Sequence, residues 1–128
     1  MEPSKELDEL VNSVIGAAIE VHRHLGPGYL ESVYEEALGV ELAERHIPCR
    51  RQHPISVTYK GKSVGEGKLD LLVADKLVVE LKAVEALLPV HKAQVISYLK
   101  ATKLHLGVLI NFNVTVLRDG IQRIIYSN

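Results

Sequence analysis

Hydrophobic residues in the first part of the chain recur every three or four positions. This spacing predicts an amphipathic helix over residues 5–25, with Ser4 as its N-cap, and a second helix over residues 30–46. Gly26-Pro27-Gly28 lies between them and is typical of a helix that ends and turns. The chain therefore begins with two helices joined by a short turn.

The period then changes from helical spacing to alternation. Residues 55–59 alternate apolar and polar side chains, which predicts a half-buried strand closed by Gly61. Residues 69–73 and 77–81 are rich in Leu and Val and predict two more strands, with a turn at 74–76. This part of the chain is expected to form antiparallel strands.

The last third contains one more helix and further strands. Pro89 suits the first turn of a helix that continues to about residue 103. Residues 105–112 are apolar almost throughout, as in a strand covered on both faces. Residues 114–118 and 121–126 flank Asp119-Gly120, which predicts a hairpin. The order α-α-β-β-β-α-β-β-β predicts an α/β fold with one mixed sheet flanked by helices.

Composition limits the class of protein. The 128 residues, 47% hydrophobic, with 15 basic and 16 acidic side chains, are expected to form one globular domain over residues 1–128. The single cysteine, Cys49, cannot form an internal disulfide, and the polar N-terminus does not resemble a signal peptide. No apolar run reaches the roughly 18 residues of a membrane span. We therefore expect a soluble cytoplasmic protein without a membrane partner.

One carboxylate falls on the apolar side of the second predicted helix. On a helical wheel, Leu38 and Leu42 lie within about 20° of Glu31. Glu31 therefore projects from the apolar stripe. A simpler interpretation stays open, because a carboxylate in the first turn is also favoured by the helix dipole.

Two more carboxylates interrupt the central strands. Asp70 is surrounded by leucines, and Glu80 and Lys82 are two residues apart, so both leave the same face of their strand. A three-residue turn at 74–76 would place Asp70 opposite Glu80, whereas a two-residue turn would place it opposite Leu81 on the other face. In the first register, a divalent cation would relieve the repulsion between the two carboxylates.

Together these residues suggest phosphodiester hydrolysis. Mg²⁺ prefers oxygen ligands and retains water, and Lys82 could orient that water or stabilise charge on a phosphate. A structural network of ion pairs is the alternative. The six histidines lack the spacing of zinc ligands. Gln94 and Tyr98, four residues apart, share a face of the third helix, which an amphipathic boundary alone would also explain.

The same positions resemble a known family. Asp70 followed by Glu80-Leu81-Lys82 is similar to the signature of the PD-(D/E)XK nuclease superfamily, although Leu69 stands where the name has Pro. The segment from Gln94 to Tyr98 resembles the QxxxY helix of its RecB-type and lambda-exonuclease-type branch. Residues 28–34 read GxxExxY, as in the small prokaryotic GxxExxY proteins. The resemblance implies a restriction-endonuclease-like core.

This resemblance implies a role for each candidate residue. Asp70, Glu80 and the Leu81 carbonyl would bind Mg²⁺ or Mn²⁺, and Lys82 would position the attacking water. Glu31, Gln94 and Tyr98 would complete the catalytic site. DNA is the expected partner, contacted at its phosphates, because the net charge of −1 and the few aromatic residues favour neither global attraction nor base stacking.

Two functional classes follow from these observations. The first is a metal-dependent deoxyribonuclease. The alternative is a nuclease-fold module with little or no turnover that binds nucleic acid or a protein partner. A domain this small offers limited surface for gripping a duplex, which favours a homo-oligomer or a larger complex in either case.

Overall fold

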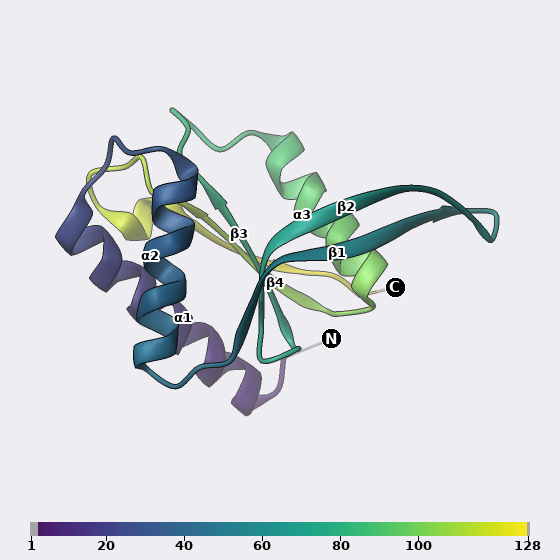
Figure 1. Ribbon diagram of the computed structural model, residues 1–128, viewed down its shortest axis with the longest axis horizontal. Coiled ribbons are helices and arrows are strands. Elements are labelled where there is room, and N and C mark those ends of the chain that lie inside the picture. Colours follow the sequence, from purple (N-terminus) through teal and green to yellow (C-terminus); the bar gives the residue numbers. More distant parts are fainter. Residues whose placement is uncertain (1–2, 128) are drawn as a thin grey trace.

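The computed structural model describes residues 3–127 and contains three α-helices, one 3₁₀ turn and a five-stranded sheet (Figure 1). The elements are α1 (Lys5–Leu25), α2 (Glu31–Glu44), β1 (Cys49–Tyr59), β2 (Lys62–Val73), β3 (Leu77–Lys82), α3 (Pro89–Thr102), β4 (Leu106–Asn111), η1 (Leu117–Gly120) and β5 (Ile121–Ile125). This arrangement confirms the predicted α/β class and the predicted helices.

The sheet is mixed, with the spatial order β1-β2-β3-β4-β5. Only β3 and β4 run parallel, and α3 forms the crossover between them. The other neighbours are antiparallel. Every residue of β4 is buried, which confirms the predicted strand with two covered faces.

Helices cover both faces of this sheet. α1 and α2 lie on one side and α3 on the other (Figure 1). Side chains of α1 and α2 pack against one cluster of sheet residues that includes Leu71 and Val79, while Val95 and Leu99 of α3 pack against a second cluster that includes Val78. In the described chain, no helix combines the length and apolarity needed to cross a membrane.

The α1–α2 turn fixes where the second helix begins. The Ser4 hydroxyl accepts a hydrogen bond from the Leu7 N–H at 3.1 Å, which caps α1 as predicted. At the other end, Tyr34 is fully buried, and its hydroxyl donates to the Gly26 carbonyl at 2.6 Å. The Tyr34 ring also stacks on Phe112 of the core, with centroids 4.5 Å apart. These contacts hold the first turn of α2 against the sheet.

β1 and β2 form a long two-stranded arm that extends beyond the rest of the sheet (Figure 1). Both strands are longer than the sequence pattern predicted, because β1 starts at Cys49 and β2 at Lys62. Most side chains of the arm are exposed. Residues 55–59 form a strand as their apolar–polar alternation predicted, but Val57 and Tyr59 are exposed, so the strand is not half-buried there.

The predicted hairpin at Asp119-Gly120 is wrong. Residues 114–118 do not form a strand, and β5 pairs directly with β4. Leu117 instead packs in the core beside α1, and the Val114 carbonyl contacts His22 of α1. Gly120 lies so close to the Asn111 backbone that a Cβ atom would approach its carbonyl oxygen to 2.3 Å. Long-range packing thus overrides the local turn signal.

Candidate functional site

The turn between β2 and β3 sets the position of the two strand carboxylates. Val73 pairs with Leu77, and Leu71 pairs with Val79, so the turn contains three residues. This confirms the register that places Asp70 opposite Glu80. Ala74 and Asp75 adopt positive φ angles of 52° and 57° to close the turn.

At Asp70 and Glu80, side chains replace the regular backbone ladder. The Asp70 N–H donates to Glu80 Oε1 at 2.8 Å, and the Leu81 N–H donates to Asp70 Oδ2 at 2.9 Å. Each carboxylate thus accepts a hydrogen bond from the opposite strand. This exchange fixes the orientation of both side chains.

The two carboxyl groups are close, and that of Glu80 is poorly solvated. Glu80 is only 2% exposed. Burial, and after it the negative charge of Asp70, raises the pKa of Glu80 to about 9, although the Asp70 N–H and Lys82 act in the opposite direction. In the metal-free protein Glu80 therefore retains its proton at neutral pH, and the pair lacks a cation that would favour its ionised form.

Lys82 faces the third helix from the same strand as Glu80. Its ammonium group donates to Gln94 Oε1 at 2.9 Å, and the Gln94 amide donates to the Tyr98 hydroxyl at 3.2 Å. The pKa of Tyr98 is raised by burial and by the charges of Glu80 and Asp70, which places this hydroxyl within the field of the carboxylate pair. Lys82, Gln94 and Tyr98 therefore form one chain beside Glu80.

Glu31 is the first residue of α2 and is half-buried. Burial raises its pKa first, Asp70 and Glu35 raise it further, and Lys82 lowers it. Glu31 thus lies within the electrostatic reach of Asp70 and Lys82. The structure brings all six candidate residues to one region, where the end of the β2–β3 ladder meets α2 and α3.

Comparison with known proteins identifies the family. The sequence profile of the PD-(D/E)XK nuclease superfamily matches residues 8–124. The chain belongs to this superfamily. Searches of curated proteins and of solved structures gave no match. The match covers both the helix that carries Glu31 and the strands that carry Asp70 and Glu80.

PD-(D/E)XK nucleases generally use divalent metals, and the donors present fit a hard cation. Asp70 and Glu80 supply carboxylate oxygens, and a bound cation would favour the ionised form of Glu80, whose pKa is raised by burial and by the charge of Asp70. Among residues 3–127, however, no group of three or more His, Cys, Asp or Glu side chains is arranged to hold a metal ion. Glu31 is therefore near this carboxylate pair without forming a three-carboxylate cluster.

Two residues near Asp70 were not identified from the sequence. Glu35, on α2, is 8% exposed, and its Oε1 accepts a hydrogen bond from Gln52 Nε2 at 2.7 Å. The same Gln52 nitrogen lies 3.5 Å from Asp70 Oδ1. A helical wheel could have indicated Glu35, which lies about 40° from Glu31 on the apolar side. Nothing in the local sequence marks Gln52.

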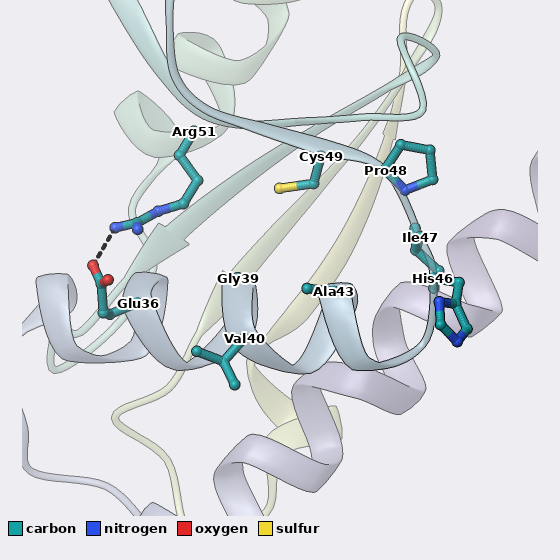
Figure 2. A pocket seen from close by; sticks show the side chains of 9 residues that line it. All are labelled: Glu36, Gly39, Val40, Ala43, His46, Ile47, Pro48, Cys49 and Arg51. Carbon is teal, nitrogen blue, oxygen red and sulfur yellow. Dashed lines mark hydrogen bonds and ion pairs between the residues drawn. The ribbon is translucent and has the colours of Figure 1, made fainter.

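A hollow of the surface lies elsewhere. It measures about 600 Å³ and is bordered by α2 and the start of β1 (Figure 2). Val40 and Ala43 line it from the helix, and Cys49 and Arg51 from the strand. None of the six candidate residues borders this hollow. It is therefore a groove separate from the carboxylate pair.

Proposed function

We propose that this member of the PD-(D/E)XK superfamily hydrolyses phosphodiester bonds of DNA with Mg²⁺ or Mn²⁺. The observation that supports this most strongly is the pair of the buried Glu80 and the partly buried Asp70, with Lys82 two residues after Glu80 on the same strand. Asp70, Glu80 and the Leu81 carbonyl would be the protein ligands of the metal. When bound, the metal would lower the pKa of a coordinated water and stabilise negative charge on the phosphate.

Lys82 is held for a role in the reaction rather than in an ion pair. Its ammonium group bonds to the neutral amide of Gln94, and within residues 3–127 no lysine forms an ion pair with a carboxylate. Two of its protons remain for an attacking water or a phosphate oxygen. Lys82 would orient the water and offset charge in the transition state.

The helix residues would complete the reaction site. Gln94 orients the Lys82 ammonium group, and the Gln94 amide in turn donates to the Tyr98 hydroxyl across one helical turn. Glu31 lies at the start of α2, the helix on the opposite face of the sheet from α3. A raised pKa lets Glu31 retain or exchange a proton closer to neutral pH than an ordinary glutamate.

The basic side chains indicate where DNA would bind. Arg45, Arg50 and Arg51 each contact a carboxylate of the same chain, so much of their charge is already compensated. Lysines on the β1–β2 arm and near the end of α3 lack such partners within the described residues and would contact phosphates: Lys60, Lys62, Lys68, Lys100 and Lys103. We therefore place the DNA on the arm and α3 side of the carboxylate pair.

A cleavage assay tests the proposal. Linear, nicked and branched DNA are incubated with Mg²⁺ or Mn²⁺ and either wild-type protein or Asp70→Ala. Asp75→Ala is the matched control, because Asp75 is exposed in the turn that follows the same strand. Metal-dependent cleavage should occur with the wild type and the control and disappear in Asp70→Ala.

The same assay separates the enzyme from a module that only binds. DNA binding that is independent of metal, without cleavage of any substrate, would favour a nuclease-fold binding module instead. Equal cleavage by Asp70→Ala and the wild type would show that another site, or a contaminant, performs the reaction. Either result would refute the proposed function.

A further inference from the structure

Gln52 has an unusual backbone for a residue within a strand. Its φ angle is 51°, in the left-handed region, while its neighbours Arg51 and His53 remain paired with Leu71 and Leu69 of β2. A side chain with a Cβ atom adopts this conformation only at an energetic cost. The surrounding structure must therefore compensate for this strain.

The consequence is a change in where the Gln52 side chain points. In a regular strand, adjacent residues lie on opposite faces. Here the adjacent residues Arg51 and Gln52 both bind the Glu35 carboxylate: Arg51 donates to Oε2 at 2.9 Å, and Gln52 donates to Oε1 at 2.7 Å. The positive φ thus turns Gln52 toward Glu35 of α2. Arg51 also reaches Glu36 on the same helix (Figure 2).

In this position the Gln52 amide lies between two carboxylates. Its nitrogen is 2.7 Å from Glu35 Oε1 and 3.5 Å from Asp70 Oδ1. The amide group has two N–H donors and can offer one to each oxygen. Leu81 N–H already holds the other oxygen of Asp70, Oδ2. A backbone N–H therefore holds Asp70 Oδ2, and the Gln52 amide lies within reach of Oδ1.

We propose that Gln52 is a positioning residue for the metal ligand Asp70, anchored through Glu35 to helix α2. This inference rests on the metal site of the proposed function. The neutral amide separates the negative charges of Glu35 and Asp70 and restricts the rotation of the Asp70 carboxylate. Gln52 also links Asp70 of β2 to Glu35 of α2, one helical turn after Glu31. Asp70 and Glu31 therefore keep a fixed relative position.

Metal affinity is the measurement that tests this role. Gln52→Met keeps the length of the side chain but removes the amide, and Mn²⁺ alone is titrated into the protein. Loss of a group that orients a metal ligand typically weakens metal binding about ten- to a hundredfold. Gln122→Met is the matched control, because Gln122 is exposed on β5, at the opposite edge of the sheet. The control should bind Mn²⁺ like the wild type.

A second variant separates positioning from strain. Gln52→Gly adopts a positive φ without penalty and also lacks the amide. We expect Gln52→Gly to lose as much Mn²⁺ affinity as Gln52→Met, while its metal-free melting temperature is higher than that of Gln52→Met. A purely structural role would change the melting temperatures and leave the Mn²⁺ affinity unchanged.

The possible failures can be told apart. Wild-type affinity for Mn²⁺ in both Gln52 variants, with binding lost in Asp70→Ala, would overturn the role of Gln52 and leave the proposed metal site intact. Absence of Mn²⁺ binding by the wild-type chain would overturn both. Recovery of affinity in Gln52→Asn relative to Gln52→Gly would support the amide specifically, because Asn tolerates positive φ and retains the donor.

Discussion

This protein contains two pairs of neighbouring carboxylates, which receive different hydrogen-bond donors. Glu35 and Glu36 of α2 share Arg51, which donates to them at 2.9 and 2.6 Å. Arg51 lowers the pKa of Glu36 through a hydrogen bond and its charge. Asp70 and Glu80 receive backbone N–H donors, and the pKa of Glu80 is raised to about 9. One pair is neutralised by the protein, and the other is not.

This difference separates structural from reactive acidic groups. A guanidinium group satisfies carboxylates permanently, because it remains charged at all ordinary pH values and binds in a fixed geometry. Backbone N–H donors orient a carboxylate without cancelling its charge. The Asp70–Glu80 pair therefore keeps the capacity to attract a cation, while the Arg51 cluster fastens α2 to β1.

The largest expected effect is on the cleavage rate and comes from Lys82, the cationic side chain beside Asp70 and Glu80. Lys82→Ala should lower the rate of DNA cleavage about 10²–10³-fold, the usual loss when one preorganised transition-state donor is removed. Single-turnover cleavage rates at saturating Mn²⁺ measure this. Lys76→Ala is the control, because Lys76 is exposed in the β2–β3 turn. An unchanged rate in Lys82→Ala would remove Lys82 from the mechanism.

Metal should stabilise the Asp70–Glu80 pair and have no such effect when the pair is broken. At a Mn²⁺ concentration 100 times its Kd, the free energy of unfolding should rise by about 2.7 kcal/mol. Glu80→Gln should abolish this increase, because it removes one ligand charge. Thermal unfolding with and without Mn²⁺ gives the comparison. The same increase in wild type and variant would mean that Mn²⁺ binds elsewhere.

The neutralised pair should depend on its arginine and not on metal. Arg51→Met should reduce the free energy of unfolding by about 1–3 kcal/mol, because the buried Glu35 carboxylate loses a charged donor. Glu36→Gln, at an exposed position, should leave the melting temperature unchanged. Chemical denaturation without metal measures both. A larger loss in Glu36→Gln than in Arg51→Met would contradict this interpretation of the cluster.

The last prediction concerns pH. Below about pH 4.5, Glu80 is protonated in both the folded and the unfolded chain, so it does not change the free energy of unfolding with pH. Between pH 4.5 and about 9, the unfolded chain has lost a proton that the folded chain retains, so the free energy of unfolding of the metal-free protein falls as pH rises. The slope is at most about 1.4 kcal/mol per pH unit for this one group.

Denaturation curves of the metal-free protein at several pH values test this direction. Glu80→Gln cannot lose a proton at this position, so its stability should depend less on pH and should exceed that of the wild type near pH 8. A wild-type protein whose stability rises steadily from pH 5 to 8, with the same slope in Glu80→Gln, would show that Glu80 is not responsible.

Local rules in the sequence predicted much of the site. The side-chain period of a strand is two, so the turn length at residues 74–76 alone determines whether Asp70 and Glu80 share a face. The helical period likewise placed Glu31 near Leu38 and Leu42, and both leucines are buried. The chemical roles assigned to these residues remain predictions until the assays above are performed.

Other features were decided only when distant segments packed together. The turn signal at Asp119-Gly120 predicted a hairpin, but β5 pairs with β4, and Leu117 is recruited to the core. The positive φ of Gln52 has no local cause, because it depends on Glu35 and Asp70, which lie 17 and 18 residues away along the chain.

By itself, the sequence determined the helices and the strand positions of the carboxylates, because caps and side-chain periods act over a few residues. It left two registers open for Asp70 and Glu80, and the structure decided between them. The tertiary structure decided which carboxylates are neutralised. Arg51 and Gln52 reach Glu35 only after β1 packs beside α2. The balance of charge around Asp70 and Glu80 is therefore a property of the assembled fold, since electrostatic energies depend on distances through space and on burial.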